Sequence, residues 1–285
     1  MEYLFNSSGH RFRGGSDTLE LWQIVVALLQ GLVEWLPISS EGQVVLVVYN
    51  FTAVPLAEVV SLVAWLHLGT ALAVIVRYPK TIFNIISLKD KTLTRLLLIA
   101  TVATAITAIP LYVFLKSNIA VFQGELLNIL VGVLLLFTAL ILYLPTRREE
   151  VASVIDTKEP TNKEALLTGL IQGSSVLPGL SRSGVTVSAL LIQKIDRETA
   201  LRFSFLMSVP AVIGILAVEI LTGNTIPSSI GILDLAIIEG IVFIVGLASM
   251  EFLLRLARRV NFWKLCVILA VIAIIFGIPA LFNPA

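Results

Sequence analysis

Long apolar runs are the feature that most constrains what this chain can fold into. Six segments carry few charged residues and approach the roughly 20 residues that a helix needs to cross the hydrocarbon core of a bilayer. They are residues 56–76, 96–115, 126–144, 203–221, 232–254 and 263–282. Only 14% of all residues are charged, compared with about a quarter in soluble domains. The sequence therefore predicts an all-α integral membrane protein with six spanning helices.

The remaining composition excludes several classes of partner and site. A net charge of +1 gives no reason to expect a nucleic acid as partner. The single cysteine, Cys266, lies in an apolar segment and is expected to be a small core residue. Residues 1–20 lack the apolar stretch of a signal peptide and are expected to be a flexible N-terminal tail. The sequence has no His/Cys cluster and no Walker A motif, so neither a zinc site nor ATP binding is expected.

Two polar interruptions divide the chain into similar halves. Residues 34–42 read EWLPISSEG and residues 175–184 read SVLPGLSRSG, with their Leu-Pro pairs 141 positions apart, about half of the chain. Each motif breaks a hydrophobic segment, 22–52 or 165–193, and three apolar runs follow each segment. Proline, glycine and polar residues leave backbone groups that lipid cannot satisfy. Each segment is therefore predicted to be a re-entrant helical hairpin.

The distribution of positive charge predicts the orientation of the halves. If the N-terminus lies outside, the cytoplasmic connectors hold 5, 4, 3 and 4 lysine and arginine residues, 16 of the 20 in the chain, as the positive-inside rule requires. These connectors are residues 77–95, 145–163, 194–202 and 255–264. Three spans per half give the halves opposite orientations, so the hairpins enter from opposite faces and meet near the midplane. The prediction is a single membrane domain, 21–285, made of two inverted repeats of about 21–144 and 164–282.

Arg182 is the strongest chemical signal in the second motif, PGLSRSGVTVS (178–188). An arginine at membrane depth costs about 2.5–3.5 kcal/mol, so it needs compensation. Its guanidinium matches the geometry of phosphate, and the start of a helix adds free backbone N–H groups that favour an anion. The alternative is a structural ion pair with a carboxylate. The polar and small neighbours favour phosphate binding; they are Ser181, Ser183, Gly184 and Thr186.

The first motif supplies a carboxylate and a pair of hydroxyl groups. Glu34 lies on the apolar run that ends at Pro37, and a buried carboxylate needs a partner. Arg182 is that partner if the hairpins meet. Ser40 is predicted to be a nucleophile and Ser39 to cap the following half-helix. Further polar atoms in the same turn come from Glu41 and Gln43.

GLVEWLPISSEGQ and PGLSRSG resemble the signature motifs of the undecaprenyl-diphosphate phosphatase family, integral-membrane enzymes linked to bacitracin resistance. Residues 67–76, HLGTALAVIV, and 196–214, DRETALRFSFLMSVPAVIG, are similar to further family segments, so the resemblance covers nearly the whole chain after residue 20. It implies an inverted-repeat fold with two re-entrant hairpins in the cell membrane. It also implies removal of the terminal phosphate of undecaprenyl diphosphate on the outer face, which recycles the lipid carrier for cell-envelope biogenesis.

The resemblance implies roles residue by residue. Glu34, Ser39, Ser40 and Arg182 match the family's site residues, with Ser181 and Ser183 beside the arginine. Glu34 with oxygens of the substrate would bind a divalent cation, Mg²⁺ or Ca²⁺. The predicted catalytic residues are Ser40, Glu34, Arg182 and Glu41. The predicted substrate-binding residues are Ser39, Gln43, Gln30, Ser181, Ser183, Gly184 and Thr186.

This chain departs from the family pattern in its first motif. Gln30 stands where the family has a glutamate, Glu41 where it has a threonine, and Gln43 where it has a histidine. Gln43 cannot shuttle a proton, whereas Glu41 adds a carboxylate able to transfer protons or bind a metal. His67 lies where the family tends to have glutamine, and the favoured interpretation is a hydrogen bond between helices, although it could point into the same cavity.

Two functions remain open from the sequence. The favoured one is a hydrolase that converts a polyprenyl diphosphate to the monophosphate and inorganic phosphate. The alternative is a polyprenyl-phosphate transporter or flippase with weakened or lost phosphatase activity, because inverted repeats with broken helices at the midplane are also transporter architecture. A purely structural scaffold would explain neither Arg182 nor Glu34.

Overall fold

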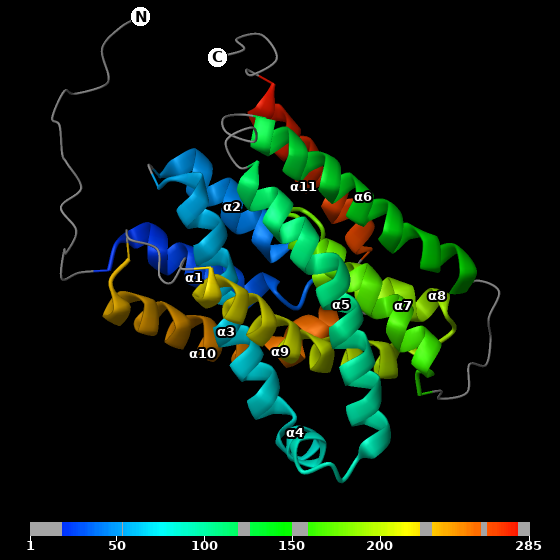
Figure 1. Cartoon of the computed structure of the whole chain (residues 1–285). Coiled ribbons are helices and arrows are strands. Elements are labelled where there is room, and N and C mark those ends of the chain that lie inside the picture. The colour runs from blue at the N-terminus through cyan, green and yellow to red at the C-terminus, as the bar shows by residue number, and fades with distance from the viewer. Residues whose placement is uncertain are drawn as a thin grey trace, which may run out of the picture.

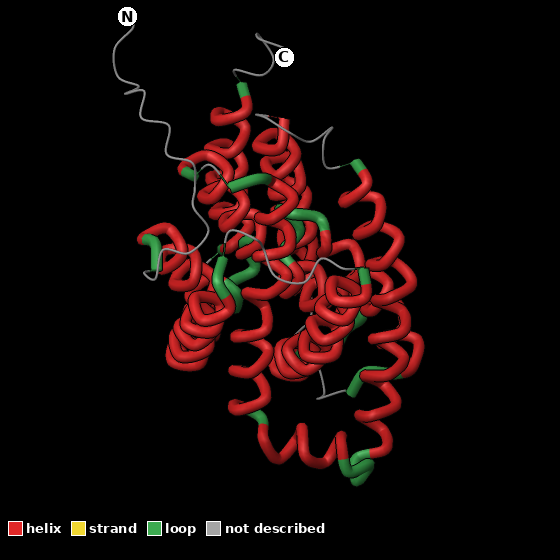
Figure 2. Tube along the Cα trace, turned by 60° about the vertical axis from the view of Figure 1, so that its left-hand side comes forward, coloured by secondary structure: helices red, strands yellow, loops and turns green. Residues whose placement is uncertain are grey.

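The computed structural model describes residues 19–52, 54–118, 126–149, 159–222, 230–257 and 261–278. These residues form helices and connecting turns and contain no strand (Figures 1 and 2). The helices are α1 (Leu21–Val33), α2 (Ser40–Phe51), α3 (Leu56–Arg77), α4 (Pro79–Ile86), α5 (Lys91–Ser117), α6 (Leu126–Glu149), α7 (Asn162–Gly173), the 3-10 helix η1 (Ser174–Val176), α8 (Arg182–Ile192), α9 (Arg197–Leu221), α10 (Ile232–Ala257) and α11 (Phe262–Gly277). The predicted all-α class is confirmed for this part of the chain; residues 1–18 of the predicted tail lie outside it.

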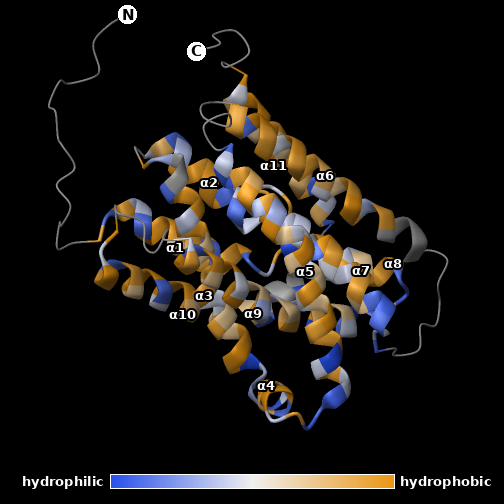
Figure 3. Ribbon diagram, viewed as in Figure 1, coloured by the Kyte–Doolittle hydropathy of each residue, from blue (hydrophilic) through white to orange (hydrophobic). Residues whose placement is uncertain are grey.

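Five helices are long and apolar enough to cross a membrane, namely α3, α5, α6, α9 and α10. Hydrophobic residues predominate along these helices, whereas hydrophilic residues gather at the connection from α4 to α5 and at the start of α7 (Figure 3). The sixth predicted span, 263–282, overlaps with α11, whose 16 residues are fewer than the roughly 20 that a spanning helix needs. Residues beyond 278 lie outside the described chain, so the sixth span stays a prediction.

The two interrupted segments each form a pair of short helices. α1 packs against α2 and α7 packs against α8, and in Figure 1 the free ends of the first pair lie on the left and those of the second on the right. Pro37 and Pro178 favour a break, because a proline disfavours helical backbone in the residue before it. The backbone then becomes left-handed at Ser39 (φ 59°) and Gly179 (φ 112°). Neither pair can form one continuous helix.

Small residues let neighbouring helices approach closely. α7 lies against α5, both α1 and α3 lie against α10, and α11 runs beside α6 (Figure 1). A glycine stands at each of these contacts, where a Cβ would overlap with the neighbouring helix. The four glycines are Gly169, Gly31, Gly69 and Gly132. The Gly169 carbonyl also accepts a hydrogen bond from the Thr104 hydroxyl (3.0 Å), so α7 is held on α5 by polar as well as steric contacts.

A buried ion pair links three spans. Glu219 of α9 is fully buried, and its carboxylate accepts hydrogen bonds from Lys116 of α5 (2.5 Å) and Ser61 of α3 (2.8 Å). The Lys116 ammonium also lies 5.1 Å from the centre of the Tyr112 ring. Charges within membrane helices need such partners. The network therefore fixes the relative positions of α3, α5 and α9.

Replacing Gly169 by alanine should destabilise the protein, because the new Cβ would overlap with the Ala100 carbonyl of α5. Overpacking of this kind costs about 1–3 kcal/mol. Gly240→Ala on α10 is the matched control, since nothing lies within 4 Å of the Cβ that it would add. The thermal unfolding temperature in detergent should fall for Gly169→Ala and stay level or rise for Gly240→Ala. Equal effects of the two substitutions would contradict the proposed role of the α5–α7 contact.

Candidate active site

The turns of the two hairpins touch at Ser39. Its Oγ accepts hydrogen bonds from the Gly42 amide (3.2 Å), which caps α2, and from the Gly179 amide (3.1 Å) of the other hairpin. A Cβ at Gly42 would lie 3.0 Å from the Gly179 nitrogen, which favours glycine at this contact. Thr138 of α6 supports the second turn by donating to the Gly179 carbonyl (2.9 Å). Two motifs separated by half of the chain therefore form one junction.

Glu34 lies at this junction, and only 3% of its side chain is exposed. Its Oε1 pairs with the Arg182 guanidinium, as the sequence predicts for hairpins that meet. Its Oε2 accepts hydrogen bonds from the Ser40 hydroxyl (2.6 Å) and the Gln30 amide (2.9 Å). The Nε2 atom of His67 lies 3.6 Å from the same Oε2. A cation and two donors compensate the buried carboxylate, and the short contact places Glu34 where a base for Ser40 must be.

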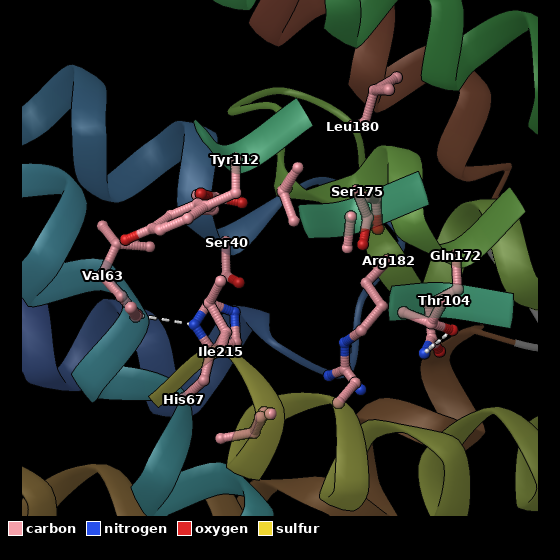
Figure 4. Close-up of a pocket in the computed structure, with 18 of the residues that line it drawn as sticks. Ser40, Val63, His67, Thr104, Tyr112, Gln172, Ser175, Leu180, Arg182 and Ile215 are labelled. Atoms are coloured by element: carbon pink, nitrogen blue, oxygen red, sulfur yellow. Dashed lines mark hydrogen bonds between the residues drawn. The ribbon is translucent and has the colours of Figure 1, made fainter. Parts of the chain in front are cut away.

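Arg182 is the first residue of α8, and its guanidinium reaches the cavity that adjoins Glu34. In Figure 4 it extends into the cavity across from Ser40 and His67. Ser181 caps α8 by accepting a hydrogen bond from the Gly184 amide (3.2 Å). The planar guanidinium, fixed by this helix start and by Glu34, can bind an anion placed beside the Ser40 hydroxyl.

The cavity has a volume of about 170 Å³ and two chemically different parts. The hairpin turns form its polar end, whereas α3, α5 and α9 contribute apolar residues such as Val63 and Ile215 (Figure 4). Seven of the predicted site residues line it: Glu34, Ser39, Ser40, Glu41, Ser181, Arg182 and Ser183. The arrangement joins an anion-binding end to a surface suited to a hydrocarbon chain.

Four predicted substrate-binding residues do not line the cavity: Gln30, Gln43, Gly184 and Thr186. Gln30 instead supports Glu34, as described above. The Gln43 amide donates to the Ile38 carbonyl (3.3 Å), and the Thr186 hydroxyl donates to the Arg182 carbonyl (2.8 Å). These contacts hold the turns and the start of α8 in shape, so the four residues act on the site through its framework.

The cavity also contains residues that the sequence does not single out as part of a site. Thr104, Tyr112, Gln172 and Ser175 line it, and no spacing of polar residues in their segments indicates this. His67, which the sequence does single out with the cavity as an alternative position, lines it as well (Figure 4). Its Nδ1 bonds to the Val63 carbonyl of its own helix (2.7 Å), which corrects the expectation of a hydrogen bond between helices. The signal in the sequence is an ionisable residue inside a span, and its alternative interpretation, a side chain at the cavity, is the one that the structure supports.

The divalent cation expected at Glu34 stays a prediction, and the contacts of Glu34 do not require it. Both of its carboxylate oxygens are already occupied, one by the Arg182 guanidinium and the other by two hydrogen-bond donors. Within the described ranges, no three His, Cys, Asp or Glu side chains gather as metal ligands would. In this geometry Glu34 serves as the counter-ion of Arg182 and the acceptor of Ser40.

Comparison of the sequence with known proteins identifies its family. The family model described as bacitracin resistance protein BacA matches residues 23–275. An undecaprenyl-diphosphatase from Methanothrix thermoacetophila is 38% identical over 254 residues, which cover 89% of this chain and 95% of that protein. Proteins of the same name from Methanopyrus kandleri and Treponema denticola are 35% and 33% identical; the matches cover 92% and 83% of this chain and 98% and 88% of those proteins. The chain therefore belongs to the bacitracin resistance protein BacA family.

Proposed function

We propose that this membrane protein hydrolyses an undecaprenyl-type polyprenyl diphosphate to the polyprenyl monophosphate and inorganic phosphate. The observation that carries the proposal is the cluster of Ser40, Glu34 and Arg182, in which a hydroxyl, an acceptor for its proton and a cation share one cavity. The name undecaprenyl-diphosphatase, borne by relatives that match over nearly their whole length, supports it. The apolar part of the cavity suits the first units of an isoprenoid chain.

The proposed reaction proceeds through a phosphoserine. Ser40 Oγ attacks the terminal phosphorus while Glu34 accepts the hydroxyl proton. The Oγ–P bond forms and the bridging P–O bond breaks, so the polyprenyl monophosphate leaves with the electron pair of that bond. Arg182 neutralises charge on the phosphoryl oxygens, which matters because phosphoryl transfer depends mainly on positioning and electrostatic stabilisation. Water then releases phosphate, and Glu34 returns the proton to Ser40.

The departures from the family pattern are compatible with this reaction. Gln30 and Gln43 lie outside the cavity lining, so neither position has to supply an ionisable group to the substrate. Gln30 instead orients Glu34 through its amide. Glu41 does line the cavity and makes no hydrogen bond within the described residues, which keeps it a candidate for proton transfer.

We further propose two inverted repeats with six spans. Corresponding helices have corresponding neighbours, because α1 packs against α10 as α7 packs against α5. The free ends of the two hairpins lie on opposite sides of the molecule in Figure 1. In the same view α4 lies at the bottom, whereas the end of α6 and the start of α7 lie on the right; all three adjoin connectors rich in lysine and arginine. These features are typical of an inverted repeat that obeys the positive-inside rule.

The same orientation supports a site reached from the outer side. The cavity extends from the hairpin turns to Val60, Tyr112 and Val218. These residues lie near the start of α3 and near the ends of α5 and α9, which the proposed topology places at the outer face. The lipid would enter sideways between the spans, with its diphosphate at the turns and its tail along the apolar wall.

Purified protein should release inorganic phosphate from undecaprenyl diphosphate. Ser40→Ala should lower kcat at least ~10³-fold because it removes the nucleophile. Arg182→Lys should lower it about 10²-fold, because lysine keeps the charge but loses the planar pair of donors. Ser87→Ala and Arg77→Lys are matched controls. The Ser87 hydroxyl donates to the Phe83 carbonyl, and Arg77 makes an exposed ion pair with Glu251, so neither side chain contacts the site.

Phosphate release is the measurement, and the outcomes separate the two candidate functions. Release that survives unchanged in both site variants would contradict the proposed site. Absence of release by the wild-type protein, together with transfer of labelled polyprenyl phosphate across vesicles, would instead favour the transporter.

The two neighbouring serines should behave differently when each is replaced by alanine. Ser39→Ala removes the acceptor of the Gly42 and Gly179 amides and should cost about 1–2 kcal/mol of stability while leaving part of the activity. Ser40→Ala removes one of the two donors to the buried Glu34 carboxylate, so it should also lower the melting temperature, but it alone should abolish turnover. Melting curves and phosphate release on the same preparations check both expectations. The reverse pattern would assign the nucleophile to Ser39.

Cysteine labelling in intact cells tests the topology. In a Cys266→Ala background, Thr222→Cys at the end of α9 should react with a membrane-impermeant maleimide, since its position is exposed and the topology places it outside. Lys89→Cys, between α4 and α5, should react only after the cells are opened. Labelling of Lys89→Cys alone in intact cells would reverse the proposed orientation.

A further inference from the structure

His67 is an imidazole fixed beside the nucleophile. Its Nδ1 lies 2.7 Å from the Val63 carbonyl, and because a carbonyl only accepts, Nδ1 must carry the proton. Nε2 makes no hydrogen bond within the described residues and lies 3.6 Å from Glu34 Oε2, the atom that also accepts the Ser40 hydroxyl. Figure 4 shows His67 below Ser40, at the same cavity. The nitrogen that can gain a proton therefore lies near the atom that would carry the phosphoryl group.

No other ionisable group that lines the cavity has a nitrogen able to accept a proton beside the Ser40–Glu34 pair. The groups that line the cavity besides His67 are Glu34, Glu41, Tyr112 and Arg182. A guanidinium offers no lone pair to accept a proton in proteins, and a phenol is a weak base. Glu34 is paired with Arg182 and takes the Ser40 proton in the first step. Glu41 has no contact with Glu34 or Ser40 within hydrogen-bond distance in the described chain, whereas His67 borders the Ser40–Glu34 pair directly.

The position of Gln43 strengthens this assignment. Its amide donates to the Ile38 carbonyl within the same hairpin and lies outside the cavity lining. An amide has no proton to give or take near neutral pH. The first hairpin therefore places no imidazole at the cavity, whereas α3 places the imidazole of His67 there.

We propose that His67 is the general base that activates water in the second half of the reaction, the hydrolysis of phosphoserine at Ser40. This assignment rests on the proposed phosphatase function and adds to it. A lone pair on Nε2 takes a proton from a water molecule in the cavity as the water oxygen bonds to phosphorus. The P–Oγ bond breaks, and Ser40 recovers the proton held by Glu34. The proton on Nε2 then passes to the departing phosphate, which leaves imidazole, carboxylate and hydroxyl as they began.

The test compares the two halves of the reaction in His67→Gln by rapid quenching. The first half gives polyprenyl monophosphate and a phosphoserine, and the second gives inorganic phosphate. His67→Gln should form one equivalent of monophosphate and of phosphoserine at a rate close to wild type. Release of inorganic phosphate should then be slower by about 10²–10⁴-fold, the usual contribution of a general base. The initial burst also shows that the substituted site is folded and binds substrate.

A second variant gives an independent measurement. His67→Ala should accumulate phosphoserine in the same way, and added imidazole should accelerate its loss, which a purely structural role for His67 would not produce. Ser40→Ala is the control that forms neither the burst nor the phosphoserine.

Each outcome bears on one of the two proposals. Wild-type turnover in His67→Gln, or equal loss of the burst and of phosphate release, overturns the role of His67 and leaves the phosphatase function intact. Failure of imidazole to accelerate phosphoserine loss also counts against that role. Absence of phosphate release by the wild-type protein overturns the phosphatase function itself.

Discussion

The ion pair between Glu34 and Arg182 is the interaction on which the rest of the structure depends. Each residue lies in a hairpin predicted to enter the membrane, where an unpaired charge costs several kcal/mol, about 2.5–3.5 for an arginine at mid-membrane on insertion scales. The two residues belong to different halves of the chain, so they can pair only if both hairpins reach the same depth. The contact between Ser39 and Gly179 follows from that meeting, and so does the cavity that both hairpin turns line.

Much of this arrangement is readable from the sequence, because it depends on local properties and on scarce charges. The length of an apolar run fixes where a span lies, and five of the six predicted runs correspond to helices of sufficient length. Proline and glycine in a polar break exclude a continuous helix, so α1–α2 and α7–α8 could be expected. Glu34 has few cations at its depth, and Arg182 was therefore the partner to expect.

The direction of individual side chains could not be read in the same way. Glu41 and Gln43 are two residues apart in the first turn of α2, yet one faces the cavity and the other donates to Ile38. Which of them faces inward depends on how α2 begins, and that is set by the left-handed backbone at Ser39 and its bond to a glycine 140 residues away. A non-glycine residue seldom adopts this conformation without support from tertiary contacts. The sequence near residue 40 does not indicate this contact with Gly179.

The same reasoning explains why a site can keep its chemistry while its residues change place. A reaction at phosphorus requires a nucleophile, a cation and a base at particular positions in space, and these roles are recognised by geometry rather than by order in the chain. In the proposed reaction the first hairpin supplies Ser40 and Glu34, and α8 supplies Arg182. The loss of an ionisable group at Gln43 removes a base only if no other element reaches the cavity. α3 does reach it, and His67 on that span lies against the carboxylate that binds the nucleophile.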